Sequence, residues 1–373
     1  MKNKNISQIQ GLRGLAILGI FIFHTQTFLS DAIRSQCSPI IQQLGTIGVI
    51  TFFIISGFLL TYKNKVIPNL PWKNRITECR NKFHKLYFIY LLTLCIAFFG
   101  KNNIPQNLSD WIYTIISLPL NLTYTQDLIP LTRINISFNG PAWYISAMFI
   151  IWIIAYSFST SINTINFFNK KKCLVGILII IGIQSIYKVM EFYFPIHLIP
   201  INHPDIYMSW ISYFSPFYNF GYFILGCFIG RLALLQKAKI TFTIYKYLAL
   251  TLIISLSFFI NDQTHFEYYK PILIEISIGI LLLIILSPNS YLGYIFSLRP
   301  LVWIGDLSAS IFLIHGAINY NLKYIENSIE KPLLFFIALT ITIIASLISE
   351  KYLILKRNEN ILQHIRKITQ SIF

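Results

Sequence analysis

The sequence predicts an all-α integral membrane protein with about ten transmembrane helices. Of the 373 residues, 55% are hydrophobic and only 12% are charged, and the mean hydropathy is +0.62. A soluble domain carries about a quarter charged residues, so the missing charge indicates a lipid environment. Apolar stretches long enough to cross a hydrocarbon core of about 30 Å recur along almost the whole chain. We therefore expect residues 1–373 to form one transmembrane domain.

Each expected span is an apolar run bounded by loops that contain most of the charged residues. The ten spans are placed at residues 10–30, 42–62, 86–100, 141–160, 173–190, 209–230, 247–261, 271–287, 301–320 and 332–350. Residues 351–373 are expected to form a tail, with no fused extracellular domain. The longest loop, residues 101–140, contains an apolar patch too short to span, which predicts an interfacial or re-entrant helix.

The basic residues indicate the orientation. With the N terminus in the cytoplasm, 22 of the 30 Lys and Arg residues lie in inside segments and only seven in outside ones. This excess of positive charge inside predicts that both termini are cytoplasmic. The net charge of +16 does not indicate a nucleic-acid partner, because the basic residues are spread over short loops and do not form one soluble face.

Two ionisable residues lie inside the first span, where they are costly and by default functional. Arg13 and His24 are 11 positions apart, so on a helix they differ by about 20° and share one face. They lie about 16 Å apart along the helix axis, and such a stripe needs a polar cavity. The alternative is that Arg13 extends to the interface and His24 packs against a polar neighbour.

The chemistry of this pair indicates a substrate that enters from the cytoplasmic side. A guanidinium is suited to a phosphate-bearing donor, and an imidazole deeper in the membrane is suited to proton abstraction near neutral pH. His24 is the expected base. His315 lies seven residues after Ser308, so these two side chains also share a helix face.

Four motifs resemble the bacterial membrane acyltransferase family 3, which O-acylates cell-surface sugars. The first is RGLAILGIFIFH, which begins at Arg13, and the second is GTIGVITFFIISGFLLT, which contains Ser56. The third is GPAWYISAM, which contains Trp143 and Ser146, and the fourth is DLSASIFLIHG, which ends just after His315.

The chain departs from the family pattern at two places. Before the third span, Lys82 and Lys85 stand where the family commonly has two arginines, and Arg80 lies slightly upstream. A lysine retains the charge but not the bidentate geometry of arginine. In the fourth span, Met148 stands where a large branch of the family has a glutamate.

The resemblance implies transfer of an acyl group, most simply acetyl, from a cytoplasmic coenzyme A thioester to a hydroxyl of a cell-surface or lipid-linked polysaccharide. It implies a multi-pass protein of the bacterial inner membrane that acts on glycans such as exopolysaccharide or O-antigen. Acetyl-coenzyme A or another acyl-coenzyme A is then a co-substrate, with no bound cofactor and no metal. The expected residues are His24 and His315 for catalysis, Arg13, Lys82, Lys85, Arg80 and Ser56 for the donor, and Trp143, Ser146, Ser308 and Glu275 for the acceptor.

A transporter or flippase is the alternative function, because the same arginine and histidine could line a substrate path. Such proteins often show helix-breaking glycines and prolines at corresponding places in two halves, and the sequence lacks that symmetry. The transferase is therefore the favoured interpretation.

Overall fold

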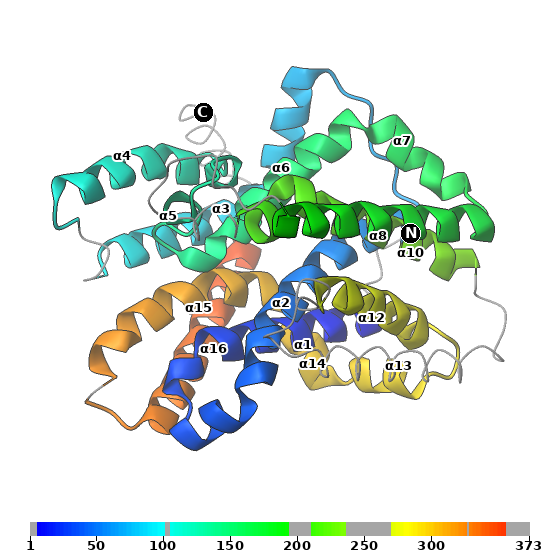
Figure 1. Cartoon of the computed structure of the whole chain (residues 1–373). Coiled ribbons are helices and arrows are strands. Elements are labelled where there is room, and N and C mark those ends of the chain that lie inside the picture. The colour runs from blue at the N-terminus through cyan, green and yellow to red at the C-terminus, as the bar shows by residue number, and fades with distance from the viewer. Residues whose placement is uncertain (1–5, 101–104, 194–209, 236–269, 327, 356–373) are drawn as a thin grey trace.

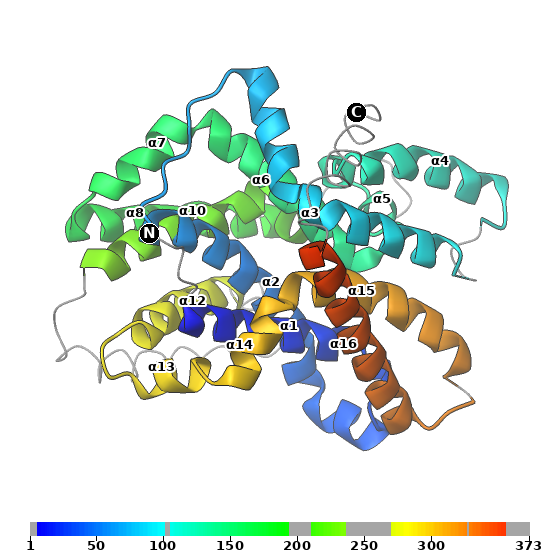
Figure 2. The same cartoon turned by 180° about the vertical axis from the view of Figure 1, so that it is seen from behind.

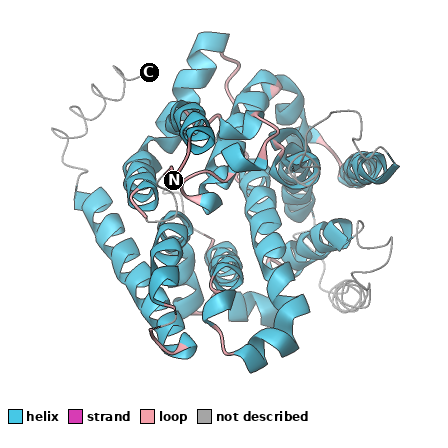
Figure 3. Cartoon of the chain, turned by 60° about the vertical axis from the view of Figure 1, so that its left-hand side comes forward, coloured by secondary structure: helices cyan, strands magenta, loops and turns pink. Residues whose placement is uncertain are grey.

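The computed structural model describes residues 6–100, 105–193, 210–235, 270–326 and 328–355, and every regular element in these ranges is helical (Figure 3). The longer helices are α1 (Ser7–His24), α2 (Asp31–Tyr62), α3 (Trp72–Phe98), α4 (Leu108–Leu122), α6 (Trp143–Ser157), α8 (Lys170–Tyr193), α10 (Pro216–Leu235), α12 (Lys270–Ile285), α14 (Arg299–Asp306), α15 (Ser308–Leu322) and α16 (Lys331–Leu355). The shorter elements are η1 (Gln26–Phe28), η2 (Gln126–Leu128), α5 (Thr132–Asn135), η3 (Gly140–Ala142), α7 (Ser159–Thr164), η4 (Ile165–Phe167), a π-helical turn η5 (Trp210–Phe214), α13 (Tyr291–Phe296) and η8 (Lys323–Ile325).

Helices α1 and α2 lie in the middle of the molecule (Figure 1). Helix α2 packs against both α1 and α10, and its side chains Phe53, Ile54 and Phe58 are fully buried. Helix α1 also packs along α14 and against α15. Figure 2 shows the same arrangement from behind, with α16 beside α15. The first span is therefore enclosed by protein on several sides, as a span that contains an arginine requires.

Glycines allow α2 and α10 to approach until their backbones touch. A Cβ added at Gly57 on α2 would lie 1.8 Å from the carbonyl oxygen of Phe223 on α10, and one added at Gly226 would lie 2.0 Å from the carbonyl oxygen of Ile54 on α2. Small residues support this kind of close packing between membrane helices. The glycine-rich second motif thus has a structural role on this face of α2.

Glycines also allow close packing between α1 and α14. A Cβ at Gly14 would lie 2.2 Å from the carbonyl oxygen of Leu301, and one at Gly305 would lie 1.8 Å from the carbonyl oxygen of Gln10. The side chain of Gln10 also donates a hydrogen bond of 2.6 Å to Asp306 Oδ1. These contacts fix the part of α1 that carries Arg13.

Five helical segments in the described residues are long and apolar enough to cross a bilayer, or six when α14 and α15 count as one bent span. The five are Asp31–Tyr62, Gly140–Ser157, Lys170–Val189, Pro216–Leu235 and Lys331–Lys351. The Lys170–Val189 and Lys331–Lys351 segments bury only 17% and 22% of their most apolar window inside the protein, as expected for helices that face lipid. The chain is thus an all-α, multi-pass membrane protein. The span expected at residues 247–261 lies outside the described residues.

Three expected element boundaries differ clearly from the structure. Helix α2 begins at Asp31 and not at residue 42, so most of the loop expected before the second span is helical. Helix α3 begins at Trp72, so the basic run that contains Lys82 and Lys85 lies on a helix and not in the loop that we expected up to residue 85. Polar residues such as Lys, Arg and Glu favour helices but give no apolar signal, which explains the short prediction. The ninth span is divided at Leu307 into α14 and α15, which meet at a bend of 68°.

Helix α4 lies at the edge of the molecule in both views (Figures 1 and 2). Its 15 residues extend over only about 22 Å, which is shorter than a hydrocarbon core. Trp111, Ile112 and Ile115 are exposed along one side of it. The structure therefore places a short amphipathic helix where the sequence predicts an interfacial or re-entrant one.

Candidate active site

A histidine pair forms where α1 meets α15. The ring centroids of His24, the last residue of α1, and His315 on α15 are 5.0 Å apart. Phe21 and Phe312 contact the His315 ring at centroid distances of 6.4 and 5.9 Å, and Phe23 packs edge-on against His24 at 4.9 Å. Both imidazoles therefore sit in a largely aromatic environment.

The tautomer of His315 follows from its hydrogen bond. Its Nδ1 lies 2.9 Å from the carbonyl oxygen of Ile311, which can only accept, so Nδ1 carries the proton in the neutral ring. Its Nε2 is buried and has no hydrogen-bond partner among the described residues. A neutral imidazole held in this way presents a free lone pair at Nε2, which is the form that a proton acceptor needs.

Arg13 lies nearer the start of α1 and also contacts α15. Its guanidinium donates hydrogen bonds of 2.8 Å to Ser308 Oγ and to Gln10 Oε1. Gln10 in turn donates a hydrogen bond to Asp306, so the Asp306 carboxylate is linked to the guanidinium only through the Gln10 side chain. Within the described ranges no carboxylate forms a salt bridge with Arg13. The cation therefore keeps a net positive field that favours an anionic ligand.

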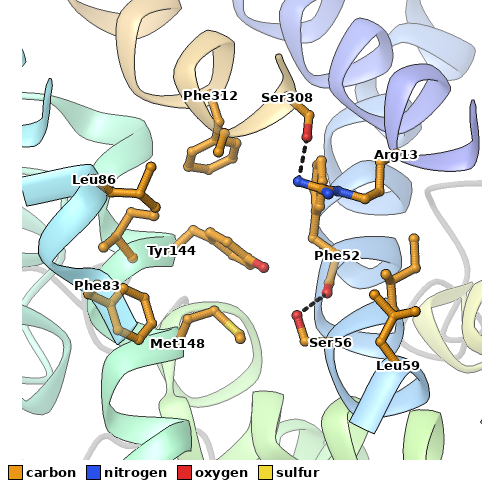
Figure 4. Close-up of a pocket in the computed structure, with 13 residues that line it drawn as sticks. Arg13, Phe52, Ser56, Leu59, Phe83, Leu86, Tyr144, Met148, Ser308 and Phe312 are labelled. Atoms are coloured by element: carbon orange, nitrogen blue, oxygen red, sulfur yellow. Dashed lines mark hydrogen bonds between the residues drawn. The ribbon is translucent and has the colours of Figure 1, made fainter. Parts of the chain in front are cut away.

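A cavity of about 250 Å³, which we call the Arg13 cavity, opens beside this guanidinium (Figure 4). Arg13, Ser308 and Ser56 lie on one side of it, and the ring of Tyr144 points its hydroxyl toward that side. Phe312 closes the end nearest the histidines, since its ring contacts both Tyr144, at 5.0 Å, and His315. The cavity is thus apolar, with a few converging polar groups, as is usual for small-molecule sites.

A second cavity, also about 250 Å³, shares Ser56 and Leu59 with the first. We call it the Lys82 cavity, because Lys82 and Lys65 line it together with Trp152 and Tyr156. The Nζ atom of Lys82 lies 2.9 Å from the centroid of the Trp152 ring, a cation–π contact. The two cavities are therefore adjacent, and each contains at least one cation.

The structure brings together five of the residues that the sequence indicated. Arg13, Ser56 and Ser308 line one cavity, and the two histidines form the pair beyond Phe312. Lys82 lines the adjacent cavity, whereas Lys85 and Arg80, both on α3, line neither of the two.

The other three residues expected to bind the acceptor lie elsewhere. The Trp143 ring packs against Tyr213 and Phe214, at 5.0 and 4.9 Å. Ser146 is buried and donates a 3.0 Å hydrogen bond to the carbonyl oxygen of Tyr124. Glu275 is buried on α12, which packs against α2 and α10. None of the three lines either of these cavities.

Sequence reasoning missed Gln10 and Phe312. Gln10 precedes Arg13 by three positions and Phe312 follows Ser308 by four, and residues at these spacings are neighbours on a helix surface. The helical spacing therefore placed both residues beside the predicted site, although a glutamine and a phenylalanine do not indicate a function by themselves. Met148, which stands in place of the family's glutamate, lines the Arg13 cavity and makes that part of its wall apolar.

No group of three or more metal-ligating side chains comes together within the described ranges.

Comparisons with curated proteins give several relatives. The chain is 29% identical over 155 residues to the acyltransferase MdmB of Streptomyces mycarofaciens, a match that covers 40% of the chain and 38% of that protein. It is 23% identical over 341 residues to the peptidoglycan O-acetyltransferase OatA of Listeria monocytogenes, covering 84% of the chain and 49% of the relative. The match to the O-acetyltransferase OatA of Staphylococcus aureus is 23% identical over 366 residues and covers 92% and 56%.

The chain spans about half the length of the two OatA proteins that it matches. No solved structure matches it significantly. A family model described as an acyltransferase domain matches residues 6–351, which includes all four motifs and both cavities. The chain therefore belongs to the acyltransferase 3 family.

Proposed function

We propose that this protein is an O-acetyltransferase of the bacterial inner membrane that moves an acetyl group from cytoplasmic acetyl-coenzyme A to a hydroxyl of a cell-surface or lipid-linked glycan. The observation that carries the proposal is the double contact between α1 and α15. Arg13 meets Ser308 and His24 meets His315, so an anion-binding cation and a proton acceptor lie along one line. Both OatA relatives are named O-acetyltransferases, which supports an acetyl group, and the name of the Listeria monocytogenes protein specifies peptidoglycan, which supports a glycan acceptor.

The donor occupies the two adjacent cavities in this proposal. Lys82 and Lys65 bind phosphates at the cytoplasmic mouth, and Arg13 binds the donor further in. The separation of about 16 Å along α1 between Arg13 and His24 leaves room for the extended pantetheine arm between its phosphates and the thioester. Phe312 must then rotate or yield to let the thioester reach the histidines.

The chemical step is a direct acyl transfer. The glycan hydroxyl oxygen attacks the thioester carbonyl carbon while its proton passes to an imidazole of the histidine pair. The carbon–sulfur bond then breaks, and the coenzyme A thiolate leaves and takes up that proton. His24 is the ring that reaches the substrate, because His315 is fully buried and His24 is only partly so. General-base catalysis of this kind contributes about 10²- to 10⁴-fold in rate.

The proposal is tested with purified protein in detergent, acetyl-coenzyme A labelled in the acetyl group, and glycans from the source bacterium as acceptors. We expect base-labile label on the glycan and one free thiol released for each acetyl transferred. A transporter would move labelled substrate into sealed vesicles without releasing a thiol. Vesicle uptake without ester formation would therefore contradict the transferase and favour the transporter.

A further inference from the structure

A third cavity, of about 370 Å³, lies between α4, the segment around α5 and the C-terminal part of α15. We call it the Asp110 cavity. The side chains that matter here are Asp110, Tyr113, Ser117, Arg133, Ser137 and Tyr320. All six side chains carry hydrogen-bonding groups, in contrast to the mainly apolar lining of the Arg13 cavity. It belongs to the region that the sequence places outside the cytoplasm.

A buried asparagine holds two of the serines that line this cavity. Asn121 is fully buried, and its Nδ2 donates hydrogen bonds of 2.9 Å to Ser137 Oγ and to the carbonyl oxygen of Ser117. The Tyr90 hydroxyl donates a 3.0 Å hydrogen bond to the carbonyl oxygen of Asn121. These bonds tie α4 to α3 and hold the loop after α5, so the two serines are fixed in the cavity wall.

Ser117 is the clearest sign of a ligand. Its side chain lines the cavity and is 1% exposed, and its Oγ has no hydrogen-bond partner in the described part of the chain. A buried hydroxyl without a partner is costly, and such groups usually have a functional explanation. A ligand hydroxyl in the cavity would supply the missing bond.

The rim of the cavity combines charge with an aromatic surface. Arg133 pairs with Asp110, and its guanidinium carbon lies 4.2 Å from the centroid of the Tyr113 ring. The side chains of Asp110 and Arg133 remain 27% and 45% exposed, so each keeps hydrogen-bonding capacity beyond the ion pair. Carboxylate acceptors, guanidinium donors and a nearby ring are the groups that recognise adjacent hydroxyls and the apolar face of a sugar.

Helix α15 carries one residue of this cavity and one member of the histidine pair. It carries Ser308 in the Arg13 cavity, then His315, then Tyr320 in the Asp110 cavity. Tyr320 lies about 7.5 Å beyond His315 along the helix axis. The side chain of Asn139 donates a 2.8 Å hydrogen bond to the carbonyl oxygen of Leu313, which holds the loop before α6 against α15 at this level. The two cavities thus lie on opposite sides of the histidines along one helix.

We infer that the Asp110 cavity binds the glycan acceptor and presents one of its hydroxyls to the histidine pair. The expected ligand is a neutral, hydroxyl-rich carbohydrate, because the opposite charges of Asp110 and Arg133 in the rim cancel and leave no net charge to attract an ion. The inference rests on the proposed acetyl transfer. It replaces Trp143, Ser146 and Glu275 with Ser117, Asp110 and Arg133 as the residues that contact the acceptor.

The test uses the full-length protein and separates the acceptor from the donor. Ser117→Ala and Asp110→Asn are expressed in the source bacterium in place of the native gene, at matched protein levels, and the ester-linked acetate of envelope glycans is measured. Ile115→Ala is the matched control, because Ile115 is exposed on the same helix and does not line the cavity. For each purified variant, the rise in thermal-unfolding midpoint on adding acetyl-coenzyme A reports donor binding.

We expect Ser117→Ala and Asp110→Asn to lower glycan acetylation at least about fivefold while the donor-induced shift stays within error of wild type. Loss of a hydrogen bond to a ligand typically costs this much in binding. Acetylation within twofold of wild type in both variants would overturn the inference, and so would an equal loss in Ile115→Ala. If the wild-type protein neither acetylates glycan nor responds to acetyl-coenzyme A, the proposed function itself fails.

Discussion

At the scale of single residues, the site depends on two contacts between the same pair of helices. Arg13 and His24 share one face of α1, and Ser308 and His315 share one face of α15. Both spacings are visible in the sequence, so the residues and their faces could be predicted. The contact between these two faces could not be predicted, because the spacing of residues on one helix does not show which other helix packs against it. The partner contacts of Gln10 and Tyr144 were beyond prediction for the same reason.

The histidine pair is expected to act as one unit. His24→Gln and His315→Gln should each lower kcat by about 10²- to 10⁴-fold, because either change breaks the imidazole pair that takes up the hydroxyl proton. The double variant should be little worse than either single one, as for residues that work together. His84→Gln on α3 is the matched control and should leave kcat unchanged. Losses that multiply in the double variant would show instead that the two rings act independently.

Lys82 and Lys85 are three residues apart, but of the two only Lys82 lines one of the three cavities described above. Lys82→Ala should therefore raise the KM for acetyl-coenzyme A several-fold with little change in kcat, and Lys82→Arg should be tolerated because phosphate accepts either cation. Lys85→Ala should change KM much less and serves as the control. Steady-state kinetics at varied acetyl-coenzyme A concentration measure both constants. An unchanged KM for acetyl-coenzyme A in Lys82→Ala would exclude a phosphate-binding role for Lys82.

At the scale of elements, long apolar runs were predicted well and helices with polar stretches were not. The runs expected at 141–160 and 332–350 correspond closely to α6 and α16, since both are continuously hydrophobic. The first half of α3 was missed because its lysines and arginines resemble a loop in a hydropathy profile. The division between α14 and α15 was missed because both halves are apolar and the bend depends on contacts with α1.

The contact between α2 and α10 gives a stability prediction. Gly226→Ala places a methyl group 2.0 Å from the carbonyl oxygen of Ile54, so the helices must separate, at a cost of about 1–3 kcal/mol. Gly182→Ala on α8 is the control, because nothing lies within 4 Å of its added Cβ. Its thermal-unfolding midpoint should be equal or higher, since alanine favours helix. An equal midpoint for both variants would mean that the close approach contributes nothing.

At the scale of the whole molecule, the orientation proposed from the basic residues places α4 outside and the N-terminal end of α8 inside. In a variant without native cysteines, a cysteine introduced at Gln106 should react with a membrane-impermeant maleimide added to intact cells. A cysteine at Lys171 should react only after the membrane is opened. Labelling of Lys171→Cys in sealed cells would show that the topology is the reverse of the proposed one. Cytoplasmic acetyl-coenzyme A could then not enter through the Lys82 cavity.

The backbone contacts at the glycines make one side of the Arg13 cavity more rigid than the other. Its α1 and α2 side belongs to a block of helices whose backbones touch α14 and α10 directly, and backbone atoms have no rotamers to change. The opposite side includes the rings of Phe83, Tyr144 and Phe312, which come from α3, α6 and α15, together with the flexible side chains of Leu86 and Met148 (Figure 4). One wall is therefore stiff and the other compliant. Any widening of the site for a bulky substrate has to come from side-chain rotations on the compliant wall, while the guanidinium on the stiff wall keeps its position.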